Sequence, residues 1–188
     1  GPAKLLQEFQ IPLVHDLPGV GENLQDHLQY RLIYELNRPI STNDQLSSWF
    51  GQFKMGLDWL LFRGGPLSIG INQGGLFTKV MGSSKTPDIQ FHMATLSAEM
   101  AGGKVHPFSG FTMSVCQLRP ESRGHVRIQS IDPLVPPKMF ANYLSTAHDR
   151  ETSIAAVKYA RKLSQTEPLR SLIVREVKPN NPKTDEEI

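Results

Sequence analysis

The chain has 188 residues, and its 20 basic and 18 acidic side chains give a formal net charge of +2 at pH 7. This length allows one domain with a sizeable core or a large piece of a longer protein, and the scattered basic residues argue against a nucleic-acid-binding surface. The single cysteine, Cys116, excludes an internal disulfide and a multi-cysteine zinc site, and no apolar run is long enough to span a membrane.

The N-terminal part predicts a short helix followed by two strands. Ala3–Phe9 places its apolar residues on one helical face, and Ile11–Val14 is a short apolar run typical of a strand. After a loop, Gln29–Leu36 alternates between apolar and polar residues, as a half-buried strand does. The apolar side of this strand carries Tyr30, Leu32, Tyr34 and Leu36.

A long amphipathic helix is predicted next. Asn43 or Asp44 can cap its start, and Gly64-Gly65-Pro66 marks its end. The basic, aromatic and Met residues of Trp49–Phe62 are interpreted as core and rim of the fold. The apolar residues that the helix carries are Leu46, Trp49, Phe50, Phe53, Leu57, Leu60 and Leu61.

The middle of the chain predicts a run of strands. Pro120–Gly124 has the polar and glycine content of a tight hairpin turn between two of them, and Asp132–Pro137 is a second turn cluster. The expected strands are Gly75–Val80, Asp88–Leu96, Phe111–Leu118, Gly124–Ser130 and Lys138–Ala141. Ala147–Thr166 follows as an amphipathic helix. Consecutive strands bounded by helices indicate an α+β fold, a mainly antiparallel β-sheet backed by α-helices.

The two ends of the chain raise the question of a fragment. Thr184 and Glu187 have the spacing of a helix capping box, yet the sequence stops at Ile188. A helix cut off at its start and a frayed, charged tail explain this equally well. Gly1-Pro2 is either native sequence or the scar of a cleaved tag.

The stretch GVGENLQDH, residues 19–27, could be taken for the glycine loop of a dinucleotide-binding enzyme. Such a loop needs a third glycine and a helix that receives the pyrophosphate, but Leu24 stands at the third position and a strand follows. An ordered turn is the better interpretation, with glycines for unusual backbone angles and with Asn23 and Asp26 bonding local N–H groups.

No complete catalytic set is visible in the residues themselves. None of the six histidines has zinc-ligand spacing, and Asp26 and His27, adjacent on a strand, would point to opposite faces. Cys116 is more typical of a core residue than of a nucleophile. Gln90 and His92 share one strand face opposite Phe91, which is either solvent-facing or a pocket wall, and the residues alone favour solvent.

Three stretches, in the same order, resemble the glucose–methanol–choline (GMC) oxidoreductases, which are flavin-dependent alcohol oxidases and dehydrogenases. Residues 1–28 are similar to the segment where that family's chain leaves the flavin domain, and Thr86–Met93 is similar to its pocket strand. Leu118–Glu151 resembles the hairpin, turn and helix that open its C-terminal part. The similarity is greatest to choline-dehydrogenase-like members.

The resemblance implies a fragment of a FAD-dependent alcohol dehydrogenase, inactive by itself, that contributes the substrate-pocket wall. Residues 1–27 would be the edge of the flavin-binding domain and residues 28–188 the substrate-binding domain, with the FAD-binding and catalytic parts elsewhere. The full-length protein would oxidise a primary alcohol by hydride transfer to the flavin, and FAD is not expected on the fragment. The family's H-P-x-G motif is only superficially matched by His106–Gly110, which precedes the hairpin, so no catalytic residue is expected here.

Six residues are implied as site residues. Asn23, Asp26 and His27 would contact or support the flavin. His92, Asn72 and Gln90 would line the substrate pocket. Asn72 stands where the family often has a glutamate, which makes a neutral alcohol at least as good a candidate as cationic choline. No metal site is expected.

The expected partner is a small-molecule alcohol, with the electron acceptor left open and no nucleic acid. The apolar wall that would meet the flavin domain predicts self-association of the fragment. A cytoplasmic location is expected, with membrane association of the full-length protein as the alternative. Two other functions stay open: a stand-alone small-ligand-binding module and an interaction module, both without catalysis.

Overall fold

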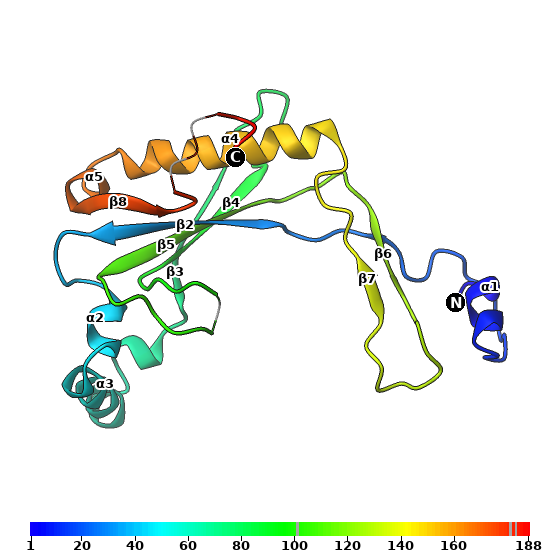
Figure 1. Ribbon diagram of the computed structural model, residues 1–188, viewed down its shortest axis with the longest axis horizontal. Coiled ribbons are helices and arrows are strands. Elements are labelled where there is room, and N and C mark those ends of the chain that lie inside the picture. Colours follow the sequence, from blue (N-terminus) through cyan, green and yellow to red (C-terminus); the bar gives the residue numbers. More distant parts are fainter. Residues whose placement is uncertain (101, 181, 183) are drawn as a thin grey trace. The chain divides into compact units, whose positions relative to one another are not determined.

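The structure is a computed structural model that describes residues 1–100, 102–180, 182 and 184–188. It divides into two compact units (Figure 1). One comprises residues 1–28 and 119–152, and the other comprises residues 29–118 and 153–188. Both contain antiparallel sheets, and helices accompany them, which confirms the predicted α+β class.

The larger unit is built on a five-stranded antiparallel sheet with the strand order β3-β4-β5-β2-β8. Its first four strands were predicted, whereas β8 was not. The strands are β2 (Gln29–Leu36), β3 (Asn72–Thr78), β4 (Ile89–Ala94), β5 (Gly110–Gln117) and β8 (Ile173–Lys178). The short helix α5 (Leu169–Leu172) precedes β8.

One face of this sheet is sealed by α4 (Ala147–Ser164), which Figure 1 shows running along the strands. The apolar side of this predicted amphipathic helix packs there, and its small residues Ala156 and Ala160 lie in the core. Each large apolar side chain buried in this way stabilises the fold by about 1.5–3 kcal/mol. The buried cluster comprises Leu32, Tyr34, Ile89, Phe91, Phe111, Met113, Val115, Ala156, Val157 and Ala160.

The central strand β5 is buried along its whole length, on both faces. Cys116 lies on the face away from α4 and is 0% exposed, which confirms its interpretation as a core residue. Burial also raises the pKa of its thiol, so that the reactive thiolate is disfavoured.

The predicted long helix is two helices, α2 (Thr42–Leu46) and α3 (Trp49–Phe62). The predicted caps were wrong, because serines begin both helices. The Ser41 N–H donates to Asp44 Oδ2 at 2.8 Å in a capping box, and Ser48 Oγ accepts the Gly51 N–H at 3.0 Å. The predicted end of the helix, at Gly64, lies two residues after its last residue, Phe62. Arg63 ends α3 by adopting a left-handed φ of 49°.

The apolar residues of α3 do not form core within this chain, contrary to the sequence interpretation. Trp49, Phe50 and Phe62 are 78%, 70% and 76% exposed, and Met55 is the buried residue of the helix. The reason is that α3 packs against little more than α2 and the short 3₁₀ helix η1 (Pro66–Ser68), which cannot cover its several apolar sides.

The smaller unit contains α1 (Ala3–Glu8) and a three-stranded sheet with the order β1-β6-β7. Its strands are β1 (Glu22–Leu24), β6 (Gly124–Arg127) and β7 (Lys138–Phe140). The turn between β6 and β7 is confirmed: the Leu134 N–H donates to Asp132 Oδ1 at 2.9 Å.

Two local predictions in this unit were wrong. Pro120–Gly124 does not close a hairpin, because β5 and β6 lie in different sheets. The buried Asp149 carboxylate holds this segment instead and accepts the N–H groups of Glu121 at 2.9 Å and Ser122 at 2.8 Å. Ile11–Val14 joins no sheet, since the Ile11 N–H donates to Leu6 O at 2.9 Å and Pro12 has no N–H to donate.

The boundary between the two units after Leu28 lies beside the predicted domain boundary at residues 27 and 28. Residues 119–152 group with the N-terminal segment. The assignment of the units to flavin and substrate roles stays a prediction.

No helix among the described residues is long and apolar enough to cross a membrane.

Candidate functional site

The face of the five-stranded sheet that points away from α4 carries polar side chains in register. Arg31 of β2, Ser114 of β5 and His92 of β4 are direct cross-strand partners and form one row. The neighbouring row contains Gln29, Cys116 and Gln90. Residues directly opposite each other in antiparallel strands share a face, so these rows form one surface, called here the polar face.

The orientation of Gln90 and His92 follows from their neighbours. Ile89 and Phe91 are 0% exposed and belong to the core under α4, so the alternating residues of β4 must point to the polar face. This confirms that Gln90 and His92 lie together on the face opposite Phe91. Both are half-buried.

A cavity of about 390 Å³ lies on the polar face. Its floor is formed by residues of β2, β3, β4 and β5: Gln29, Arg31, Asn72, Ala94, Thr112 and Ser114. Asn72 is the cross-strand partner of Ala94, which lies two residues beyond His92 on the same strand. The structure therefore brings the three predicted substrate residues onto one face, with Asn72 in the cavity and with His92 and Gln90 continuing the face beside it.

The outer wall of the cavity is formed by the segment between β4 and β5, called here the cavity-wall segment (residues 96–100 and 102–108). It folds back on itself through a bridge between Ala98 and Val105, and Leu96 O accepts the Thr112 hydroxyl at 2.9 Å. Leu96, Ala98, Met100 and Val105 face the cavity. The floor is thus polar and the wall largely apolar, which is typical of small-molecule sites.

Asn43 of α2 holds the cavity-wall segment in place. Its side chain is 1% exposed, and Oδ1 accepts the Ser97 N–H at 2.9 Å. Nδ2 donates to Ser97 O at 3.1 Å and lies 3.1 Å from both His106 O and Phe108 O. The sequence interpretation took Asn43 for a helix cap, since nothing in its local sequence signals contacts more than 50 residues away.

His106, the histidine of the superficial H-P-x-G match, is engaged within this same segment. Its ring nitrogens lie 3.2 Å from Ser97 Oγ and 3.2 Å from Glu99 Oε1, and the ring stacks on Phe108 with centroids 4.8 Å apart. These contacts give His106 a structural role in the cavity-wall segment.

Arg31 supplies the charge of the cavity. Its guanidinium donates to the carbonyl oxygens of Ala98 at 3.3 Å and Glu99 at 3.4 Å. The Glu99 carboxylate itself binds Lys178 and the His106 ring, and these partners, Lys178 first, lower its pKa. Among the described lining residues Arg31 is the one charged side chain, so the cavity is electropositive.

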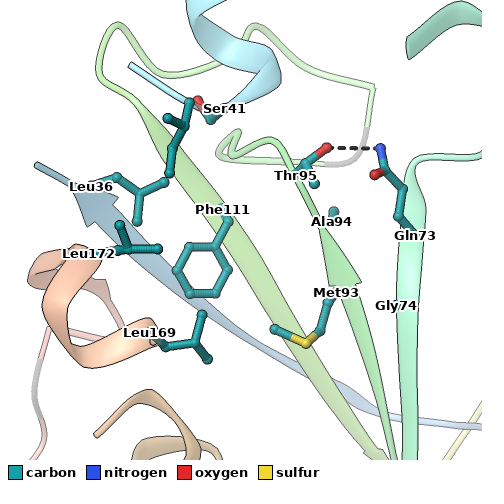
Figure 2. Close-up of a pocket in the computed structure, with 11 residues that line it drawn as sticks. Leu36, Ser41, Gln73, Gly74, Met93, Ala94, Thr95, Phe111, Leu169 and Leu172 are labelled. Carbon is teal, nitrogen blue, oxygen red and sulfur yellow. Dashed lines mark hydrogen bonds between the residues drawn. The ribbon is translucent and has the colours of Figure 1, made fainter. Parts of the chain in front are cut away.

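A second cavity, of about 350 Å³, lies on the opposite face of the sheet (Figure 2). Leu36, Met93 and Phe111 point into it from the strands, and Leu169 and Leu172 close it from α5. A hydrogen bond of 3.0 Å from Gln73 Nε2 to Thr95 Oγ1 lies at its rim. It is apolar, and none of the six predicted site residues lines it.

The first part of the stretch GVGENLQDH is an ordered turn, as predicted, but Glu22–Leu24 within it forms strand β1, which was not predicted. Gly21 has a φ of 80°, and a Cβ at this position would lie 2.2 Å from Val126 O of the paired strand, so only glycine fits. Asn23 also adopts a left-handed φ of 60° and is exposed. Asp26 Oδ1 accepts the His27 N–H at 2.8 Å, which confirms the local bond expected of Asp26.

Asp26 has a second partner that sequence reasoning missed. The Tyr143 hydroxyl donates to Asp26 Oδ2, and this bond raises the pKa of Tyr143. Both residues belong to the smaller unit, 117 positions apart in the chain. Asp26 therefore acts within the protein as an anchor, while the side chains of Asn23 and His27 are exposed. The contact of these three residues with a flavin stays a prediction.

No group of three or more His, Cys, Asp or Glu side chains in the described part of the chain is placed to hold a metal ion.

Residues 120–188 match the GMC oxidoreductase family. An oxygen-dependent choline dehydrogenase of Cronobacter sakazakii is 38% identical to this chain over 189 aligned positions, covering 100% of this chain. Over its whole length the chain is similar to the GMC oxidoreductases.

The chain spans about a third of the length of the curated relatives it matches, 34% in the case of the Cronobacter protein. Solved structures share the fold over the whole chain. A formate oxidase variant from Aspergillus oryzae matches with a TM-score of 0.85 at 17% identity, over 37% of its own length. Pyridoxine 4-oxidase from Mesorbium loti matches with a TM-score of 0.75 at 20% identity, over 33% of its length. At these identities the two structures show similarity of fold alone.

Proposed function

We propose that this chain forms the substrate-binding wall of a FAD-dependent enzyme that oxidises a primary alcohol to an aldehyde. The observation that carries the proposal is the polar face: a sheet sealed on one side by α4 presents His92, Gln90 and Asn72 together on the other. The name of the matched relative, a choline dehydrogenase, supports oxidation of a small hydroxyl compound.

The residues of the smaller unit fit a supporting role toward FAD. Asn23 is exposed, and its side-chain amide offers both donors and an acceptor, which complement the mixed carbonyl and N–H edge of a flavin. His27 is exposed next to Asp26, which anchors the turn through Tyr143. FAD, when bound, supplies the acceptor for the hydride that leaves the alcohol carbon.

The residues of the polar face would orient the alcohol. No hydrogen bond joins the side chains of Asn72, Gln90 or His92 to another described residue, so their donors and acceptors are available to a ligand. Holding the hydroxyl and its carbon in one orientation lowers the entropic cost of the reaction. The resemblance assigns the base that takes the hydroxyl proton to a histidine outside these 188 residues, so positioning is the role proposed for this chain.

A second function, an interaction module without catalysis, is favoured by the exposed apolar residues of α3. One measurement separates the two functions. The protein that contains this sequence is purified from the cells that produce it, and its mass and visible absorbance are recorded before and after anaerobic addition of primary alcohols. A flavin spectrum bleached by an alcohol is the expected result. A colourless protein of 188 residues would refute the enzyme and leave the interaction module.

A further inference from the structure

The charges around the cavity on the polar face determine which alcohols it can hold. Arg31 is the one charged residue among the described residues that line it, and the other polar floor residues, Gln29, Asn72, Thr112 and Ser114, are neutral. A cationic group in this cavity would meet a guanidinium and no carboxylate.

No carboxylate among the described residues pairs with Arg31. Both hydrogen bonds of its guanidinium go to backbone carbonyl oxygens, at 3.3 and 3.4 Å. Two carboxylates of this unit, that of Glu99 and that of Glu35 on the same strand as Arg31, have other partners. Glu99 binds Lys178 and His106, and Glu35 binds Arg175 with an Nε–Oε2 distance of 2.7 Å. A guanidinium has five N–H donors, and two of them bind described residues, so the others can bind a ligand.

We propose that the alcohol oxidised at this site carries an anionic group, a carboxylate, which Arg31 binds at the cavity while the hydroxyl lies near His92. This proposal rests on the function proposed above and specifies its substrate class. Arg31 and His92 are joined through Ser114 across three strands, so their Cα atoms are two strand spacings, about 10 Å, apart. Both residues lie on the polar face, Arg31 lining the cavity and His92 beside it, so a small hydroxy acid on this face would span the distance between them.

The guanidinium favours a carboxylate for two reasons. Its planar set of donors matches two carboxylate oxygens, and charge-assisted hydrogen bonds are roughly twice as strong as neutral ones. A cavity of about 390 Å³ also lies within the range of small-molecule sites. The rest of the enzyme meets the substrate from other sides, but the group that lies on this wall is selected by Arg31.

The test compares three alcohols in the flavin-loaded enzyme. Choline, 3,3-dimethylbutan-1-ol and 3-hydroxypropanoate share a hydroxyethyl part and end in a cationic, a neutral and an anionic group. We expect kcat/KM for 3-hydroxypropanoate to exceed that for choline by at least about tenfold. Arg31→Gln should lower kcat/KM for 3-hydroxypropanoate by about 10- to 100-fold and leave the value for 3,3-dimethylbutan-1-ol within about threefold. Arg31→Lys, which keeps the charge, should preserve the order of the three alcohols.

Arg175→Gln is the matched control, because it removes an arginine from the same sheet that does not line the cavity. It should leave the order of the alcohols unchanged. If Arg31→Gln fails to fold, the order in the unaltered enzyme and in Arg31→Lys still decides the matter. Preference for choline, or an equal loss for all three alcohols in Arg31→Gln, would overturn this proposal and leave the alcohol-oxidising function intact. A protein without flavin that oxidises none of the three would overturn both.

Discussion

Replacing Asn43 by alanine tests whether this residue holds the cavity wall. The change removes the acceptor of the Ser97 N–H, at 2.9 Å, and the donor shared among Ser97, His106 and Phe108. Asn43 is 1% exposed, so water cannot easily replace these bonds. Leaving one buried donor and several acceptors with fewer partners costs about 2–4 kcal/mol of the free energy of unfolding.

The assay is urea unfolding followed by far-UV circular dichroism, with amide hydrogen exchange at Ser97 as a local readout. Asn37→Ala is the control, because Asn37 is exposed and its side chain makes one hydrogen bond, to Ser171 O at 2.7 Å. We expect it to cost less than about 1 kcal/mol. Equal costs for the two variants, with unchanged exchange at Ser97, would refute the role assigned to Asn43.

Three further predictions concern other parts of the chain. In the flavin-loaded enzyme, His92→Ala should lower turnover with alcohol while the flavin content stays the same, and unchanged kinetics would return His92 to an ordinary surface role. Burial raises the pKa of Tyr34 to about 12, so the tyrosine is neutral in the folded state where it would ionise in the unfolded one. Because the pKa of Tyr34 is higher in the folded than in the unfolded state, keeping the hydroxyl protonated contributes to the free energy of unfolding. This contribution, about 2–3 kcal/mol, is fully present below pH 10 and is lost as the pH rises from about 10 to about 12. Urea midpoints of Tyr34→Phe should therefore fall less steeply over that window than those of the unaltered chain, and parallel curves would contradict this. The stacked pair Trp49 and Phe53 of α3 is 78% and 54% exposed, so the isolated chain should self-associate with rising concentration in analytical ultracentrifugation. Serine at both positions should weaken this association, and a strictly monomeric unaltered chain would count against it.

Most strands and the long helix α4 could be predicted because their apolar patterns match what the fold buries. Strand β2 alternates, and α4 places Val157 and Ala160 on one stripe, and these residues do form the core. Strand β8 was missed because its pattern, IVREVK, is short and follows directly on the short helix α5. The helix α3 was assigned correctly as helical, but its burial could not be read from periodicity, since its apolar residues have no cover among the described residues.

Within the site, local patterns predicted faces but not partners. Period-two alternation correctly placed Gln90 and His92 on the face opposite Phe91. The pairings of Asp26 with Tyr143 and of Asn43 with Ser97 join residues 117 and 54 positions apart, and only the fold brings them together. Arg31 was overlooked because its alternation marks it as an outward-facing strand residue, and its relevance depends on the absence of a carboxylate partner, which no local sequence reveals.

The most direct test of the central claim is a crystal structure of the flavin-loaded protein that contains this sequence. The account predicts that the flavin ring faces the polar face of the five-stranded sheet, with His92 and Ser114 on the side of the ring and α4 on the far side of the sheet. A flavin bound on the α4 side, or far from this sheet, would contradict the assignment of the polar face as the substrate-binding wall.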